Sequence, residues 1–151
     1  MEDHDEDDEL VLEFDSEASG RTAVIADEGD SVWVYLTRPD DSAIERDCWL
    51  FNKPTAPTEP ESDDYQAEGT PPPVPARFLV AEGPRPLPDE RSFRVRWSKD
   101  GHAAAVLIDG VPIGVVSADQ KRGMSRFLRE ACPWGRPWDQ AELNVLFGDM
   151  A

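Results

Sequence analysis

The sequence predicts a mainly β domain, in which antiparallel meanders form a sandwich or an open barrel and a short helix follows at the C-terminus. Short runs rich in β-branched and aromatic residues recur along the chain, as is typical of strands. Clusters of Asp, Gly and Pro separate these runs and indicate turns. Only near the C-terminus do apolar residues clearly follow the spacing of an amphipathic helix. We therefore expect about six to eight strands, the usual range for a sheet protein of this size.

Four strands are expected in the first part of the folded chain. They cover residues 10–14, 22–26, 31–37 and 46–51. The third reads Ser-Val-Trp-Val-Tyr-Leu-Thr, a composition that suits a pleated and partly buried surface. Turn-forming residues at 27–30 and 38–41 separate the last three strands from one another.

The clearest pattern lies in residues 92–117. Phe93 to Trp97 alternates apolar and basic residues, which indicates a half-buried strand. Apolar runs at 103–108 and 111–116 predict two more strands. Asp100-Gly101 and Asp109-Gly110 precede these runs, and Asp-Gly is a strong hairpin signal because both turn residues must accept positive φ. We expect a three-stranded meander, with Pro112 at an edge or a bulge.

The remaining elements are shorter. Residues 76–81 are expected to form a short edge strand, and residues 124–131 fit a helix or an extended segment. A final helix should begin after Asp139, which forms a capping-box-like pattern with Glu142. Its apolar face would consist of Leu143, Leu146 and Phe147, and Gly148 would end it.

Residues 10–151 are expected to form a single β-rich domain. Two segments differ from the rest of the chain in composition, one before this domain and one within it. Residues 1–9 contain seven acidic residues and are expected to form a disordered tail. Residues 53–75 contain seven of the fourteen prolines and predict a long surface loop. A proline-rich docking ligand is the alternative interpretation of this loop.

Charge and cysteine content limit the classes of partner and compartment. The net charge of −17 argues against binding to nucleic acid or to an anionic membrane, and it suits a basic protein partner. No apolar run reaches the length of a membrane span, and the acidic N-terminus is unlike a signal peptide. Cys48 and Cys132 stand beside apolar residues and are interpreted as reduced, packed thiols. We therefore expect a soluble cytoplasmic protein.

A set of motifs in the second half resembles a known family. Trp97-Ser98-Lys99-Asp100-Gly101 is followed by Ala104, Leu107, Ile108 and Gly110, then by Lys121-Arg122-Gly123, and finally by Trp134 and Trp138. This pattern resembles a family of small bacterial proteins that is defined only as a domain of unknown function. The resemblance covers roughly residues 22–52 and 91–140, and the acidic tail and proline-rich insert depart from it. It implies a β fold and a bacterial origin, and it transfers no activity.

The inventory of catalytic groups is poor. His4 and His102 are the only histidines, and His102 is expected at the surface beside a hairpin turn. No nucleophile elbow, Cys–His motif, phosphate-binding loop or zinc spacing is present in the sequence. The acidic tail lacks the spaced ligands of an EF-hand. We predict no catalytic, cofactor-binding or metal-binding residues, no cofactor, and a protein that is not an enzyme.

Basic residues are concentrated in one part of this acidic chain. Residues 91–138 hold nine of the fifteen basic residues and carry a net charge of +5. They form a solvated face paired with acids of the first half, or an anion site at Lys121, Arg122 and Arg126, or a surface that the acidic tail screens. Deleting residues 1–9 and measuring heparin binding would test the screening interpretation.

The five tryptophans divide into two groups. Trp33, Trp49 and Trp97 lie in predicted strands and are expected in the core. Trp134 and Trp138 lie in an irregular segment, where they either cover the sheet or serve as exposed contact residues. The candidate binding residues are therefore Lys121, Arg122, Arg126, Trp134 and Trp138.

The function that best suits this composition is a non-catalytic protein-binding module. An immunity-type inhibitor of a basic partner is one form of it, because an acidic surface accelerates association with a basic toxin or nuclease. The alternative is a small-molecule or anion-binding domain that uses the basic turn at 121–126 and the Trp134/Trp138 loop. The oligomeric state is open.

Overall fold

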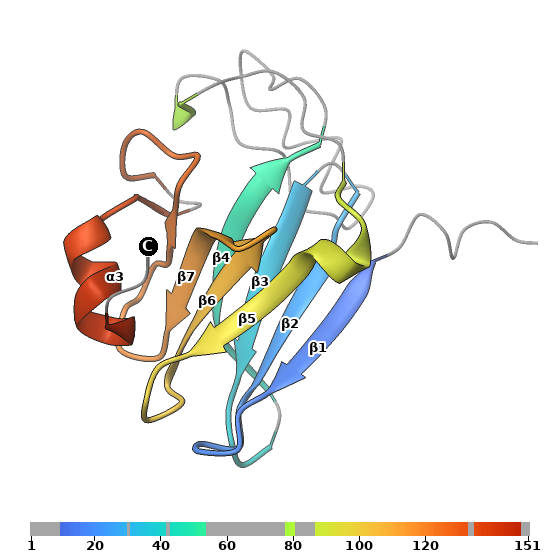
Figure 1. Cartoon of the computed structure of the whole chain (residues 1–151), viewed down its shortest axis with the longest axis vertical. Coiled ribbons are helices and arrows are strands. Elements are labelled where there is room, and N and C mark those ends of the chain that lie inside the picture. The colour runs from blue at the N-terminus through green and yellow to red at the C-terminus, as the bar shows by residue number, and fades with distance from the viewer. Residues whose placement is uncertain are drawn as a thin grey trace, which may run out of the picture.

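A computed structural model of the chain describes residues 10–29, 31–41, 43–53, 78–80, 87–132 and 135–148. The predicted acidic tail and nearly all of the predicted proline-rich loop lie outside these ranges. The described residues form two β-sheets and one α-helix (Figure 1). The prediction of a mainly β fold with a short C-terminal helix is confirmed.

The first sheet is an antiparallel meander with the strand order β1-β2-β3-β4. Its strands are β1 (Val11–Asp15), β2 (Thr22–Asp27), β3 (Ser31–Thr37) and β4 (Ile44–Asn52). All four overlap the segments that the sequence assigned to strands, with ends that differ by at most about two residues, as is usual for boundaries. The edges of this sheet within the described chain are β1 and β4.

The second sheet follows in the order β5-β6-β7-β8-β9. A 3₁₀ turn, η2 (Glu90–Ser92), leads into it. The strands are β5 (Phe93–Trp97), β6 (Ala103–Ile108), β7 (Val111–Ser117), β8 (Met124–Ser125) and β9 (Arg136–Pro137). The last pair, β8 and β9, is parallel, whereas the other strand pairs of the two sheets are antiparallel.

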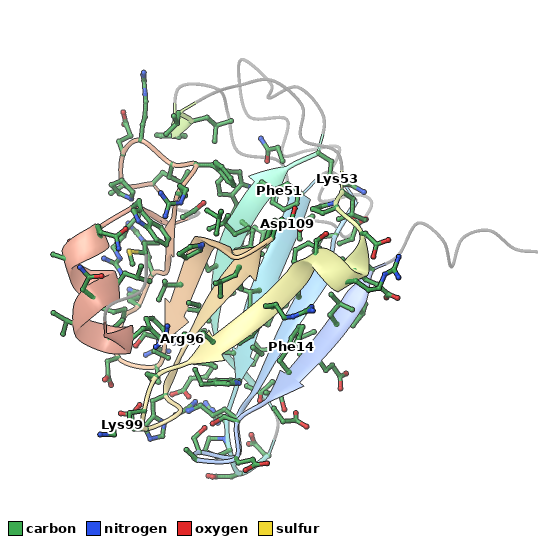
Figure 2. All side chains as sticks on the ribbon, in the orientation of Figure 1. Phe14, Phe51, Lys53, Arg96, Lys99 and Asp109 are labelled. Atoms are coloured by element: carbon green, nitrogen blue, oxygen red, sulfur yellow. The ribbon has the colours of Figure 1, made fainter. Side chains whose placement is uncertain are left out.

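The two sheets pack face to face as a sandwich and do not close into a barrel (Figure 1). Val34 and Cys48 are paired on the inner face of the first sheet, and Val106 and Val116 lie on the inner face of the second. Side chains fill the space between the ribbons in Figure 2. This single cluster removes the apolar faces of both meanders from water, which is the main stabilising contribution.

The predicted core tryptophans belong to this cluster. Trp33 and Trp49 are buried, and Trp97 is half-buried against the same residues. The indole of Trp49 donates a hydrogen bond to Asn52 (3.0 Å), and that of Trp33 donates to Ser31 (2.9 Å). Their polar groups are therefore satisfied inside the protein.

The helix α3 (Gln140–Phe147) covers the outer face of the second sheet. Leu143 and Phe147 pack there against a second apolar cluster formed by Ala103, Ala105, Val115 and Met124. Both faces of β6 are consequently covered, which explains why its sequence is a continuous apolar run without alternation. Asp139 caps the helix by accepting a hydrogen bond from the backbone of Glu142 (3.1 Å), as the capping pattern predicted.

The hairpin turns follow the sequence signals in part. Asp109 (φ 51°) and Gly110 (φ 85°) both adopt positive φ, as predicted for the turn between β6 and β7. At Asp100-Gly101 only the glycine has positive φ (77°), so the two-residue turn predicted there is wrong. The chain forms a wider loop instead, closed by hydrogen bonds between Ser98 and Ala103.

Three weaker expectations are now resolved for the described residues. Pro112 stands beside a register shift between β6 and β7, which confirms the predicted bulge. Residues 124–131 do not form a helix, because β8 is followed by turns. Of the edge strand predicted at 76–81, residues 78–80 are described, and Leu79 forms an isolated bridge with Leu128.

Candidate functional site

The predicted basic turn joins β7 to β8. Lys121 and Arg122 lie on it with exposed side chains. Gly123 ends the turn at a point where a Cβ atom would lie 2.5 Å from the carbonyl oxygen of Val115 and 2.6 Å from Cβ of Cys48. Because no side chain fits there, the glycine allows the basic turn to lie directly against the core.

An open depression of about 310 Å³ lies beside this turn. Its lining residues are Gln120, Lys121, Arg122, Ala131 and Arg136. Arg136 donates from Nε to the carbonyl oxygen of Arg122 (2.9 Å), and its two terminal nitrogens each lie 3.0 Å from the carboxylate of Glu142. This pairing raises the pKa of Arg136 and neutralises its charge. Lys121 and Arg122 supply the remaining positive charge of the depression.

Arg126 and Trp138 form a separate contact. The Arg126 guanidinium lies 4.4 Å from the centre of the Trp138 ring, and its Nε donates to the carbonyl oxygen of Pro112 (2.7 Å). Burial lowers the pKa of Arg126. Trp138 itself packs against the apolar cluster under α3. These two residues are part of the covering layer of the second sheet, and the depression beside Lys121 is lined by other residues.

The predicted binding residues therefore do not form one site in the structure. Lys121 and Arg122 come together, Arg126 pairs with Trp138, and Trp134 lies outside the described residues. Sequence reasoning included Arg136 in the basic stretch and did not select it as a site residue. Its contact with Glu142 joins β9 to α3, and no sequence spacing indicates that contact.

The ion pairs of the basic stretch differ from those that the first interpretation expected. Within the described ranges, its ion pairs are Arg91–Asp89 (3.2 Å) and Arg136–Glu142 (3.0 Å). Both acids lie outside residues 10–52, so pairing with the first half is wrong for these residues. Arg96 instead donates to the carbonyl oxygen of Phe147 (3.1 Å) at the C-terminal end of α3, a favourable place for a cation.

The outer face of the first sheet carries acidic and aromatic groups. Cys48 points inward, because its sulfur lies 3.5 Å from the carbonyl oxygen of Met124 in the second sheet. Successive side chains of a strand alternate between faces, so Asp47 points outward. Tyr35 is its partner across β3 and β4 and shares that face. Trp33 stacks on Tyr35 with ring centres 6.4 Å apart and planes within 8°.

Carboxylates surround the phenol of Tyr35. Its hydroxyl donates a hydrogen bond to Glu28, which follows β2. Burial raises the pKa of Tyr35, and the bond to Glu28 and the charges of Glu28 and Asp47 raise it further. Partial shielding from water also raises the pKa of Asp47. No ion pair among the described residues includes Asp47 or Glu28, so within that part of the chain no cation compensates the negative charge of the patch.

The groups that could act in catalysis are engaged in the fold. The Arg21 side chain donates from Nε to Nδ1 of His102 (2.9 Å), so this imidazole is half-buried in a contact between two loops rather than fully exposed. Burial raises the pKa of the Cys48 thiol to about 12, which disfavours the nucleophilic thiolate. Cys48 and Cys132 are both buried and neither is part of a disulfide, which agrees with the prediction of packed thiols. Across the described ranges, no group of three or more His, Cys, Asp or Glu residues is placed to hold a metal ion.

Comparison with protein families, with curated proteins and with solved structures finds no match to this chain. The resemblance to a bacterial domain of unknown function therefore stays a prediction. Within the described ranges, no helix has the length and apolar character that are needed to cross a membrane.

Proposed function

We propose that this protein is a non-catalytic binding module whose partner is a basic protein, and that it docks through the outer face of the first sheet. The observation that carries the proposal is the patch of Glu28, Tyr35 and Asp47. Two carboxylates flank a stacked aromatic pair there, and no described cation neutralises them. An arginine side chain of a partner would supply the missing charge and a flat group to lie against the half-buried ring of Tyr35.

The distribution of charge supports the same partner class. Residues 10–52, which form the first sheet, carry a net charge of −7, while residues 91–138 carry +5. A basic partner is therefore attracted to one side of the sandwich, and this field raises the rate of association. A specific form of this function is an immunity-type inhibitor that binds a basic toxin or nuclease.

A fluorescently labelled poly-arginine peptide tests the docking face. Asp47→Asn and Glu28→Gln should each weaken its binding several-fold, because each removes a charge from the patch. Asp109→Asn is the matched control, since it removes one exposed charge from the second sheet at a turn position that Asn tolerates. If all three variants weaken binding equally, only the net charge matters and the proposed face is wrong.

A second candidate is binding of a small anion at the depression beside Lys121 and Arg122. The observation that favours it is that these two exposed cations share one cavity. A sulfated oligosaccharide probe separates the two functions. Loss of its binding in the Lys121→Gln/Arg122→Gln variant, with the poly-arginine peptide unaffected, would support an anion site.

A further inference from the structure

The sandwich has two open strand edges on the same side. In the described chain, β1 is the first strand of one sheet and β5 is the first strand of the other. Side chains of both, among them Phe14 and Val95, pack against the same core cluster. In Figure 1, β5 runs in front of β2 and β3, and β1 lies at the right-hand edge of the sheet behind it.

These two edge strands run in the same direction. The loop after β1 meets the loop after β5, where the hydroxyl of Ser19 donates to the carbonyl oxygen of Gly101 (2.7 Å). Arg21 and His102 form a second link between the same loops (2.9 Å). The loops that follow the two strands are thus in contact, and β1 and β5 run in a similar direction in Figure 1.

Both edges have backbone groups that are free to pair. The hydrogen bonds Asp27 N to Leu10 O and Ser16 N to Arg21 O show that the even-numbered residues of β1 face β2. The amides and carbonyls of Val11, Glu13 and Asp15 therefore point outward. In β5 the bond from Ser98 N to Ala103 O gives the same alternation.

The outward backbone groups of β5 are consequently those of Phe93, Val95 and Trp97. Exposed edges of this kind are sites of strand addition.

The side chains of the two edges are complementary. In β1, Leu12 and Phe14 point to the core, while Glu13 and Asp15 point outward. In β5 the residues Phe93, Val95 and Trp97 point to the core, while Arg94 and Arg96 point outward. A β1 strand placed beside β5 would continue the apolar layer on one face and match acid with base on the other.

We propose that two copies of this chain associate through these edges, with β1 of each copy adding to β5 of the other. The two copies are related by a two-fold axis that runs parallel to the strands. This rotation places the first sheet of each copy in the same layer as the second sheet of the other copy, so that the two sheets join edge to edge. The interface is isologous, so the acid–base contact occurs twice.

The charges distinguish this arrangement from the obvious competitor. A two-fold axis perpendicular to the sheets would pair β1 with β1 and β5 with β5. It would bring Glu13 and Asp15 against the same acids, and Arg94 against Arg94, which destabilises directly opposed strands. The crossed pairing avoids both repulsions.

The overall charge opposes any self-association. Two copies at −17 repel each other, and this long-range term is screened beyond about 8 Å at physiological salt. The edge contacts are shorter than that distance and survive screening better. The dimer should therefore be more stable at moderate salt than at very low salt.

A charge-exchange experiment tests the proposal by sedimentation velocity at increasing concentration. Glu13→Arg and Arg94→Glu should each raise the dimer dissociation constant about tenfold or more, because each places like charges together at both contacts. An equimolar mixture of the two variants should regain the wild-type dissociation constant, since a mixed dimer has matched pairs at both edges. This recovery also shows that each variant is folded.

A matched control makes the same acid-to-base change away from the edges. Asp119→Arg lies on the exposed turn after β7 and should leave the dissociation constant within about twofold of wild type. Two results would overturn the proposal. One is a monomer at every accessible concentration and salt, and the other is a mixture that stays as weak as its components.

Discussion

Cys48 shows how a single residue joins the two sheets. Its sulfur lies 3.3 Å from the carbonyl oxygen of Trp49 and 3.5 Å from that of Met124, and the side chain is fully buried. Burial raises the pKa of the thiol from 9.0 to about 12. In the unfolded chain the thiol is exposed to water and regains its ordinary pKa.

This difference predicts a loss of stability at alkaline pH. Between the two pKa values the unfolded state has released the proton and the native state holds it. The free energy of unfolding therefore falls by about 1.4 kcal/mol for each pH unit above about 9. The variant Cys48→Ala lacks this contribution.

Urea unfolding of both proteins at about pH 7 and about pH 10 measures the contribution of Cys48. The stability advantage of the wild type over Cys48→Ala should shrink by about 1.4 kcal/mol at the higher pH. Other alkaline titrations, including that of Tyr35, are common to both proteins and cancel. An advantage that is equal at both pH values would contradict the assignment.

For single residues, the sequence predicted burial better than it predicted contact partners. Cys48 and Trp49 stand in an apolar run, and burial follows from that composition. Lys121, Arg122 and Arg126 are close in sequence, yet β8 lies between the second and the third. Arg126 therefore reaches Trp138 instead of the depression. Such a separation depends on where a two-residue strand begins, which composition does not determine.

Among the elements, α3 depends most clearly on tertiary packing. It has eight residues, and helices of this length are marginal in isolation. The cap at Asp139 and the bidentate contact between Arg136 and Glu142 fix its first turn. Burial of Leu143 and Phe147 against the second sheet then supplies most of its stability.

Two substitutions in α3 separate packing from helix propensity. Leu143 is fully buried, so Leu143→Ala should lower the free energy of unfolding by about 2–5 kcal/mol through lost burial and a residual cavity. Val145 is 83% exposed, so Val145→Ala should change it by less than about 0.5 kcal/mol. Chemical denaturation followed by circular dichroism measures both. Similar values for the two variants would show that α3 does not cover the sheet as described.

Strands that show a pattern in their own sequence could be predicted, and strands that depend on distant contacts could not. β1 to β7 each contain an apolar run bounded by turn residues, and both the strands and their meander order follow from that pattern. β8 and β9 have two residues each and show no periodicity. Their parallel pairing joins Met124 to Arg136 across an intervening loop, so it depends on the tertiary fold.

Over the whole molecule, the sequence shows that charge is distributed unevenly, but it does not show which of the charged residues are paired. The contrast between residues 10–52 and 91–138 follows from counting residues. The structure adds that Arg136 is neutralised within its own half and that Arg96 lies at the end of α3. The acidic patch around Tyr35 lacks such compensation among the described residues, which is why the proposed docking face lies on that side.

The two sheets should unfold together, because they share one core. Val34 in the first sheet and Val106 in the second are completely buried in the same cluster, and the loop contacts of Ser19 and Arg21 tie the sheets at one end. Neither sheet can expose its inner face without exposing that of the other. We expect a single unfolding transition, the behaviour of one cooperative domain.

Val34→Ala and Val106→Ala test this cooperativity from opposite layers. Each should lower the free energy of unfolding by about 1–3 kcal/mol, through the lost methyl groups and the space that they leave. Each should also shift the whole transition, with tryptophan fluorescence and far-ultraviolet circular dichroism giving the same midpoint. If the sheets were independent, Val106→Ala would shift only part of the signal and leave a second transition at the wild-type midpoint. Coincident midpoints in both variants require that the first and second meanders fold as one unit.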